Sequence, residues 1–327
     1  MQPIRYLRVT DADAAIAAMR ANAAADYVAG GTSLIDLMKL EVLTPAELVD
    51  VNALPLSKIE VTGNSVQIGA MVRNSDLAYH PEIAARFPLL AEALLAGASP
   101  QLRNMATVGG NLLQRTRCYY FRDPSTPCNK RQPGSGCGAM DGYNRNHAIL
   151  GTSERCIAAH PSDMCVALMA LDAIVHTRGP AGERQILMAE FHLLPAEYPE
   201  RESVLQHGEL VTAVTLPARP QMVQSRYLKV RDRASYAFAL TSAAATLHVE
   251  GGKIREARLA LGGVGTKPWR ALEAERALIG QRPDAPAFAR AAEAALADAR
   301  PRKHNAFKVE LARRTIVRTL ATVRVAG

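Results

Sequence analysis

Hydrophobic residues near the start of the chain follow first a strand spacing and then a helix spacing. Tyr27 to Ala29 is typical of a short buried strand, and a helix with one apolar face is expected to follow it from Leu34. Leu48 to Val51 predicts a second strand. Residues 1–52 are therefore expected to form a small α+β unit, in which a Gly-Gly-Thr-Ser turn joins strand to helix.

The pattern changes in residues 53–219, where regular spacings surround a long stretch with no period. Ser65 to Gly69 alternates as a strand does, Phe87 to Ala96 predicts a strongly apolar helix, and Pro161-Ser162-Asp163 is typical of a helix start. Between them, residues 115–156 are rich in Pro, Gly, Arg, Asn and Cys. A structureless segment of this length is uncommon inside a compact domain, so we expect something other than a hydrophobic core to organise it.

Residues 220–327 form a third predicted unit, with strands first and helices afterwards. The strands are expected over Arg226–Val230, Ala237–Val249 and Ile254–Leu261. The helices are expected over Leu272–Ile279, Ala285–Ala299 and Phe307–Val323. Strands followed by helices are typical of an α+β domain.

Composition and charge exclude several classes of protein. With 48% hydrophobic and 21% charged residues, the chain has a globular and not a disordered composition. No apolar run reaches the roughly 18–20 residues that a membrane helix needs. The net charge of +8 could favour an anionic ligand or partner, although scattered surface arginines are the ordinary source of such an excess. No dense basic run with interleaved aromatic residues is present, so nucleic acid is not an expected partner.

Two pairs of glycines stand where the backbone could approach an anion closely. The first lies in Ala29-Gly30-Gly31-Thr32-Ser33, where N–H groups, two hydroxyls and a helix N-terminus would suit a diphosphate. An ordinary tight strand–helix turn is the alternative. The second pair lies in Val108-Gly109-Gly110-Asn111-Leu112 and adds an amide side chain. Two such loops could clamp one dinucleotide from both sides, although neither has the GxGxxG pattern.

Four cysteines lie in or at the end of the segment without a period. Cys118, Cys128, Cys137 and Cys156 are separated by 10, 9 and 19 residues, and the close CxxC pairs typical of zinc sites are missing. Four separated thiolates could surround an iron–sulfur cluster. The seven Lys and Arg residues against three acids in residues 115–155 would offset the negative charge of such a cluster. Zinc, and cysteines that are free or disulfide-bonded, are the alternatives.

Other candidate ligands nearby have ordinary explanations. Cys165 falls in the apolar helix that follows and is expected to be buried and inert. His147 and His160 flank the cysteines and could be ligands, but a polar loop histidine is the more common case. No HExxH motif, P-loop or convincing Ser-His-Asp arrangement is present, so we expect no catalytic side chain in this chain.

Longer segments carry a resemblance to a known family. They are Ala29–Lys39, Ala106–Leu112, Pro161–Asp163, Tyr227–Arg231 and Leu261–Val264. In these segments the sequence resembles the FAD-binding subunit of molybdenum hydroxylases, the group of xanthine dehydrogenase, carbon monoxide dehydrogenase and aldehyde oxidoreductase, and the likeness extends over essentially the whole chain. Further segments are similar to the [4Fe-4S]-carrying medium subunit of three-subunit bacterial aldehyde oxidoreductases, namely Asn111–Cys118, Pro127–Arg131, Pro133–Cys137 and Arg231–Leu240.

The resemblance implies an α+β fold and the residues that bind its cofactors. Residues 1–52 and 53–219 would form the two subdomains of an FAD-binding fold of the PCMH/vanillyl-alcohol oxidase type, with an iron–sulfur insertion at about 115–156. Residues 220–327 would form a C-terminal α+β domain of the CO dehydrogenase flavoprotein type. In and beside the diphosphate turn, FAD would contact Ala29, Gly30, Gly31, Thr32, Ser33 and Leu34. On the flavin side it would contact Thr107, Gly109, Gly110 and Asn111. Asp163 would contact the adenosine half, and Lys229 and Tyr236 would lie near the isoalloxazine. The [4Fe-4S] ligands would be Cys118, Cys128, Cys137 and Cys156.

The resemblance also implies a division of labour between subunits. A large partner would hold the molybdenum cofactor and hydroxylate an aldehyde, a small partner would carry two [2Fe-2S] clusters, and electrons would reach FAD here and leave to an external acceptor. Many xanthine dehydrogenases have an acidic residue near the stretch that is Ser235–Tyr236 here, and its absence makes NAD an unexpected acceptor. The start of the chain lacks a secretory signal, which suits co-export to the periplasm with a partner that carries a twin-arginine signal, and equally the cytoplasm.

Two other functions compete with this one. A self-contained FAD oxidase of the same fold would act directly on a small substrate, but neither glycine-pair loop contains a His or Cys for covalent flavin attachment. A non-catalytic iron–sulfur scaffold would need no clamp for a dinucleotide, and the two glycine pairs argue against it.

Overall fold

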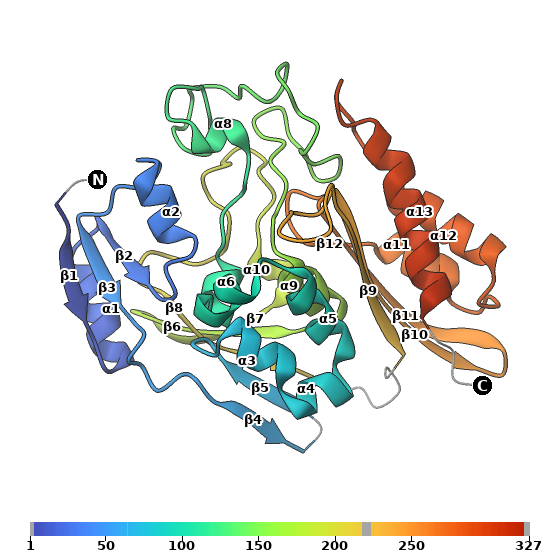
Figure 1. The fold of residues 1–327 in the computed structure, drawn as a ribbon, viewed down its shortest axis with the longest axis horizontal. Coiled ribbons are helices and arrows are strands. Elements are labelled where there is room, and N and C mark those ends of the chain that lie inside the picture. Colours follow the sequence, from blue (N-terminus) through green and yellow to red (C-terminus); the bar gives the residue numbers. More distant parts are fainter. Residues whose placement is uncertain (1–2, 64, 218–223, 324–327) are drawn as a thin grey trace.

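Three β-sheets, each with its own helices, succeed one another from the N-terminus to the C-terminus (Figure 1). The structure is a computed structural model, and it describes residues 3–63, 65–217 and 224–323. The α+β class expected from the sequence is confirmed. The predicted boundary between residues 219 and 220 lies outside the described residues.

The N-terminal unit is a three-stranded parallel sheet in the order β1-β3-β2. Its elements are β1 (Arg5–Arg8), α1 (Ala12–Ala21), β2 (Ala25–Val28), α2 (Leu34–Lys39) and β3 (Glu47–Asp50). All four residues of β3 are buried, as suits a central strand. Asp11 caps α1, because its carboxylate accepts a hydrogen bond from the Ala14 N–H at 2.8 Å.

The second unit is an antiparallel five-stranded sheet in the order β4-β5-β8-β6-β7 with helices packed on it (Figure 1). The strands are β4 (Ile59–Thr62), β5 (Ser65–Gly69), β6 (Ile174–Gly179), β7 (Gly182–Leu187) and β8 (Leu210–Leu216). The helices are α3 (Asn74–Tyr79), α4 (Pro81–Arg86), α5 (Pro88–Ala96), α6 (Pro100–Met105), α7 (Val108–Leu112), α9 (Asp163–Ala170) and α10 (Met188–Phe191). Every residue of α9 is buried, so this helix lies in the middle of the largest hydrophobic core.

The C-terminal unit is an antiparallel sheet in the order β12-β11-β10-β9 between two layers of helices. Its elements are β9 (Ser225–Val230), β10 (Thr241–Glu250), β11 (Lys253–Gly262), β12 (Trp269–Arg270), α11 (Leu272–Leu278), α12 (Ala285–Leu296) and α13 (Phe307–Thr322). The three helices cover the outer face, while α5 and α9 pack on the inner face (Figure 1). The expected strand from Ala237 begins only at Thr241. Residues 237–240 line a large cavity, although the Leu240 N–H still donates to the Val230 carbonyl of β9 at 2.9 Å.

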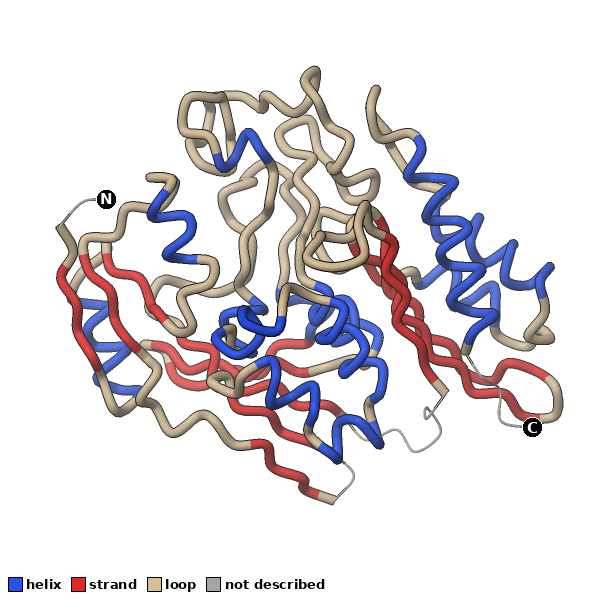
Figure 2. Tube along the Cα trace, viewed as in Figure 1, coloured by secondary structure: helices blue, strands red, loops and turns tan. Residues whose placement is uncertain are grey.

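Residues 115–156 contain little regular structure, as the missing period predicted. Their one named element is the short helix α8 (Tyr119–Arg122), and Figure 2 shows the rest as loops above the sheets. Polar contacts hold this segment together. The Arg131 guanidinium donates to the carbonyls of Tyr120 and Phe121 at 2.7 and 2.8 Å, and the Asn144 amide donates to the Ala139 carbonyl at 3.1 Å.

The second glycine-pair segment differs from its prediction. Val108 to Leu112 is the short helix α7 and not a loop, because Thr107 caps it with a hydroxyl that accepts from the Gly110 N–H at 3.1 Å. A Cβ at Gly109 would lie 3.2 Å from the Ala70 Cβ, so a larger residue there would have to displace Ala70 by a few tenths of an ångström. Among the described residues, no helix has the length and hydrophobicity that a membrane span requires.

A buried ion-pair network joins the second unit to the third. Arg270 donates to the Met169 carbonyl and to Asp172 Oδ1, both at 2.6 Å, and it also pairs with Glu275. The side chains of Arg270 and Glu275 are only 13% and 11% exposed. Because Met169 and Asp172 end α9 and begin the turn to β6, Arg270 fixes that turn against β12 and α11.

Removal of the Arg270 side chain should therefore destabilise the whole chain. We expect Arg270→Ala to lower the free energy of unfolding by about 3–5 kcal/mol, because it leaves the Glu275 carboxylate buried without its cation. The measurement is urea unfolding followed by circular dichroism. Arg276→Ala is the matched control, since its partner Glu273 is exposed and such pairs contribute about 0–1 kcal/mol. Equal losses in the two variants would contradict the role given to Arg270.

Candidate functional site

A cavity of about 1330 Å³ opens between the three units. Ligand pockets for drug-sized molecules range from about 300 to 1,000 Å³, so this one has room for a dinucleotide. Four helices of the second unit contribute to its walls: α5 and α6 with their C-terminal ends, α7, and α9 with its first residues. The start of α2 and the first part of the 115–156 segment contribute too, and the C-terminal unit adds β9 and residues 232–240. The three units meet at one site, to which each contributes side chains.

The cavity brings together many of the residues predicted to bind FAD. Those on its wall are Thr32, Ser33, Gly110, Asn111, Asp163, Lys229 and Tyr236. Those set back from the wall, in the turns that carry the others, are Ala29, Gly30, Gly31, Leu34, Thr107 and Gly109. Their assignment as cofactor-binding residues stays a prediction.

The turn after β2 is packed against the chain that leads into α7. A Cβ at Gly30 would lie 2.0 Å from the Met105 carbonyl oxygen, so only a glycine fits there. Arg73 donates to the same carbonyl and, at 3.1 Å, to the side-chain oxygen of Asn52, whose amide donates to the Ala29 carbonyl at 2.9 Å. Gly30 is thus required for an approach to the chain just before α7, and the close approach to a ligand that the sequence predicted stays a prediction.

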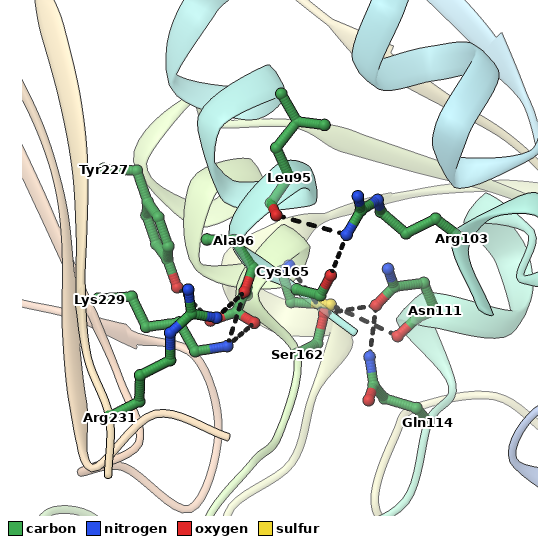
Figure 3. A network of polar contacts seen from close by, with 12 residues as sticks. Leu95, Ala96, Arg103, Asn111, Gln114, Ser162, Cys165, Tyr227, Lys229 and Arg231 are labelled. Atoms are coloured by element: carbon green, nitrogen blue, oxygen red, sulfur yellow. Dashed lines mark hydrogen bonds and ion pairs between the residues drawn. The ribbon is translucent and has the colours of Figure 1, made fainter. Parts of the chain in front are cut away.

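A polar network lies along the cavity wall where α9 begins (Figure 3). The Ser162 hydroxyl caps α9 by accepting from the Cys165 N–H at 3.0 Å, and it donates to Asn111 Oδ1 at 2.7 Å. Gln114 also donates to Asn111 Oδ1. The side chain of Asn111 is therefore held in one orientation by α7 and α9 together.

Asp163, the first residue of α9, is buried and paired with the C-terminal unit. Lys229 Nζ lies 2.8 Å from Asp163 Oδ2, and the Tyr227 hydroxyl donates to Asp163 Oδ1 at 2.5 Å. Burial, followed by the Asp163 charge, raises the pKa of Tyr227 well above its usual value, so this hydroxyl stays protonated as a donor. Asp163 thus fixes Lys229, which also donates to the Ala96 carbonyl at 3.1 Å, at the cavity wall.

Several buried polar atoms of the cavity-lining residues have no partner within the described protein. They are Ser33 Oγ, Asn74 Oδ1, Arg103 Nε, Arg117 Nε, Arg122 Nη1, His147 Nδ1, His160 Nε2 and Ser242 Oγ. Buried polar groups are nearly always hydrogen-bonded, and three of these atoms are guanidinium N–H donors. Arg117 and Arg122 each bind Asp36 of α2 through a different guanidinium nitrogen, which lies 2.9 Å from Asp36 Oδ2 in both cases. The lining therefore fits a ligand that is rich in acceptors and negatively charged.

A second, smaller pocket brings the four predicted ligand cysteines together. Cys118, Cys128, Cys137 and Cys156 all line it, and Cys128 pairs with Cys137 in an isolated antiparallel bridge. The four thiols are free of disulfides. Burial raises the pKa of Cys118 to about 12 and that of Cys156 to about 11. Thiolates at these positions would therefore need a compensating cation or metal.

Cations line the cysteine pocket and are held by a carboxylate that the sequence analysis missed. Lys130 and Arg155 lie on its wall, and Lys130 Nζ is 2.9 Å from a carboxylate oxygen of Glu202. Arg115 pairs with the other oxygen of Glu202 at 2.5 Å, and its guanidinium stacks on the Phe121 ring at 4.6 Å. Glu202 follows the cysteine segment by many residues and has no motif around it, so no spacing could have indicated its role.

A trio of side chains beside both pockets has the residue types of a metal site. Candidate ligand atoms of His160, Cys165 and His192 lie within 4.8 Å of one another, the one such trio in the part of the chain described. His192 Nε2 is 2.9 Å from the Leu112 carbonyl, which places a proton on that nitrogen. Burial lowers the pKa of His192 to about 4 and raises that of Cys165 to about 12. At neutral pH the trio is uncharged and forms part of the packing around α9, and the expected burial of Cys165 is confirmed.

Two protein families account for almost the whole chain. Residues 2–219 match the FAD binding domain in molybdopterin dehydrogenase, and residues 226–323 match the CO dehydrogenase flavoprotein C-terminal domain. The chain belongs to this family of FAD-binding subunits. It is thus the FAD-binding medium subunit of an oxidoreductase of the molybdenum hydroxylase and aldehyde oxidoreductase family, as the resemblance implied.

Individual relatives agree with this assignment. The subunit is 51% identical, over 99% of both chains, to the aldehyde oxidoreductase FAD-binding subunit PaoB of Escherichia coli. It is 30% identical to the carbon monoxide dehydrogenase medium chain of Afipia carboxidovorans over 83% of this chain and 77% of that one. Among solved structures, carbon monoxide dehydrogenase from Hydrogenophaga pseudoflava matches with a TM-score of 0.78 and 26% identity over 98% of this chain and 97% of the other.

The packing at Gly30 gives a direct test of the FAD cavity. We expect Gly30→Ala to purify with several-fold less FAD, because the new Cβ would meet the Met105 carbonyl and force apart the two segments that shape the cavity. The measurement is the ratio of flavin to protein absorbance.

The matched control is Gly252→Ala in the turn between β10 and β11. A Cβ there meets nothing within 4 Å, so the change adds only the strain of a residue at φ +71°. Full FAD occupancy in Gly30→Ala would show that the contact with Met105 does not shape the binding site.

Proposed function

We propose that this subunit carries both FAD and a [4Fe-4S] cluster and transfers electrons within a molybdenum-dependent aldehyde oxidoreductase. A large partner with the molybdenum cofactor would oxidise the aldehyde. A small partner with two [2Fe-2S] clusters would deliver the electrons to FAD in this subunit, and an external acceptor would receive them. The observation that carries the proposal is the meeting of four cysteines in one pocket whose wall includes Cys118 and Tyr120, residues that also line the large cavity.

The spacing of the four sulfurs favours a cluster over a single zinc ion. Zinc holds thiolates at about 2.3 Å, which puts the sulfurs of a tetrahedral site roughly 3.8 Å apart. Within the described chain, no three of the four pocket cysteines have sulfurs within 4.8 Å of one another. A cubane spreads its ligands over four irons and so suits sulfurs that surround a pocket at greater separation.

Charge also supports the cluster. A cubane with four thiolates is an anion, and the pocket wall offers Lys130 and Arg155. The Lys130 charge is retained near the sulfurs because Glu202 ties Lys130 and the neighbouring Arg115 to the segment while occupying only part of their donors. In the absence of such cations, buried thiolates would be costly, as the raised pKa values of Cys118 and Cys156 indicate.

The residues on the cavity wall suit the binding of FAD. Thr32 and Ser33 would meet the diphosphate at the start of α2, while Arg103, Arg117 and Arg122 would supply the positive charge. FAD supplies the electron chemistry when it is bound. The side chains around it position it and exclude water, and Lys229 is held for this purpose by Asp163.

The self-contained oxidase is the remaining alternative. No His or Cys lies in residues 29–34 or 107–112, so the two glycine-pair segments offer no covalent flavin attachment.

The electron acceptor is proposed to be something other than NAD. An acidic residue on the cavity wall close to Ser235 in sequence is Asp232. Its carboxylate is already bound by Arg145 in a bidentate pair with both bonds at 2.8 Å, so it is not free to assist NAD chemistry.

Location in the periplasm by co-export stays a prediction, which fractionation of the producing cells would test.

The cluster ligands can be tested by replacing single cysteines. We expect Cys128→Ser to lose most of its iron and to become sensitive to proteases in residues 115–156, because metal binding also supplies folding free energy there. The measurements are iron and sulfide per chain and limited proteolysis.

Cys165→Ser is the matched control, since Cys165 is as buried as Cys128 but lies in α9, outside the cysteine pocket. Its iron content should equal that of the wild type. Equal iron loss in both variants would mean that the four ligands are wrongly assigned.

Electron transfer by this subunit can be separated from aldehyde oxidation. We expect an aromatic aldehyde to leave the flavin of the isolated subunit oxidised and to bleach it rapidly when the two partners are present, because the sequence offers no candidate nucleophile or metal-bound water for aldehyde oxidation. Stopped-flow absorbance near the flavin maximum is the measurement. Bleaching in the isolated subunit would favour the self-contained oxidase, and fast reduction of NAD by the complete enzyme would overturn the proposed acceptor.

A further inference from the structure

His147 stands between the cysteine pocket and the large cavity. Its Nε2 atom lies 3.1 Å from Cys118 Sγ, and the residue lines the large cavity. His147 lies in a loop, as expected, but is only 2% exposed. Of the four pocket cysteines, Cys118 is the one that also lines the large cavity. The contact therefore falls on the sulfur that the two proposed cofactor sites share.

The position of His147 is fixed through its backbone by the C-terminal unit. The His147 carbonyl accepts from Lys308 Nζ at 3.0 Å and from the Asn305 amide at 3.3 Å. Its own N–H donates to the Asn144 carbonyl at 3.0 Å. Lys308 is completely buried and donates a second bond to the Gly263 carbonyl at 2.8 Å. The backbone of His147 is thus anchored from two units, and its buried side chain extends from that fixed position to Cys118.

The chemistry of an iron-bound thiolate determines the direction of this contact. A coordinated cysteine has no proton to donate, so the proton between the two atoms must belong to His147 Nε2. The other ring nitrogen, Nδ1, has no partner within the described protein. The arrangement is that of a hydrogen-bond donor aimed at one ligand of the cluster.

We propose that His147 is a positioning residue that donates a hydrogen bond to Cys118 Sγ and thereby raises the reduction potential of the [4Fe-4S] cluster. This inference rests on the cluster of the proposed function. Reduction adds one electron to the cluster and breaks no bond at Cys118, so the negative charge on the sulfurs increases. A donor at 3.1 Å stabilises that charge more in the reduced state than in the oxidised state, which favours reduction.

Two replacements of His147 separate the hydrogen bond from the bulk of the ring. His147→Leu removes the donor while keeping an apolar side chain, whereas His147→Gln keeps an N–H donor of similar reach. We expect the midpoint potential of the cluster to fall in His147→Leu and to stay near that of the wild type in His147→Gln. The measurement is a dithionite titration followed by electron paramagnetic resonance, with iron and sulfide determined for each protein.

His304→Leu is the matched control. His304 lies beside the Tyr143 ring, with ring centroids 5.4 Å apart, and lines neither pocket. Its loss should leave the potential unchanged. An unchanged potential in His147→Leu with full iron content would overturn the inference, and so would an equal fall in His304→Leu. A wild-type subunit without iron or sulfide would instead refute the cluster itself.

A second measurement needs no variant, in case His147→Leu fails to retain iron. The wild-type subunit labelled with ¹⁵N-histidine would be reduced and studied by electron–nuclear double resonance. We expect one weak nitrogen coupling, because the nitrogen is one hydrogen bond away from a ligand sulfur. No coupling, or one large enough for a nitrogen bound directly to iron, would overturn the proposed hydrogen bond.

Discussion

The burial of α9 is the constraint on which the rest of the structure depends. All its residues are buried, and both ends of the helix are tied to the C-terminal unit. At the first residue, Asp163 pairs with Lys229 and accepts from Tyr227, and beyond the last residue Arg270 binds the Met169 carbonyl and Asp172. A helix held in this way fixes the five-stranded sheet of the second unit, the sheet of the C-terminal unit and the cavity at the N-terminus of α9. The position of the cofactor site thus follows from the packing of one short helix.

The 115–156 segment is organised by a different kind of interaction. It has almost no hydrophobic core of its own, and hydrogen bonds each contribute only about 0.5–1.5 kcal/mol net. Its anchors are charged groups that reach it from elsewhere, such as the partly buried Glu202 from beyond β7 and the fully buried Lys308 from α13. Such anchors restrict the segment but leave the thiols of Cys118 and Cys156, whose pKa values are raised by burial, costly to ionise without a metal. A cluster that binds all four pocket cysteines would add the free energy that the missing core does not provide.

Local regularities made much of the fold predictable from the sequence. β5 has the predicted bounds, α5 and α13 differ by one residue at an end, and the lack of a period in 115–156 corresponds to the observed loops. The sequence failed where a distant partner decides the structure. Residues 237–240 continue a strand pattern but line the cavity, and the glycine-pair segment after Thr107 is wound into α7 by its cap.

The candidate functional site was likewise predictable from the sequence only in part. The glycine pairs and the cysteines were recognisable because their residue types and spacing are local features. His147, Glu202 and Lys308 were not recognised in these roles, because each acts on a residue or segment that only the tertiary fold brings near. The contact of Gly30 with the Met105 carbonyl belongs to the same class. A turn that is typical of ligand binding in the sequence serves first to join two parts of the chain.

The charges around the large cavity suit the binding of a cofactor better than acid–base catalysis. The groups there that could exchange a proton near neutral pH are held in one state. Burial, together with His192, lowers the pKa of His160 well below its usual value, and burial raises that of Tyr227. His160 therefore stays neutral above its depressed pKa, and Tyr227 stays protonated up to its elevated one. The positive charge comes from arginines such as Arg103 and Arg117, which do not titrate in this range. A lining whose charge is constant with pH can bind an anionic cofactor and set its electrostatic environment, whereas a general acid or base would need a group whose pKa lies near the working pH.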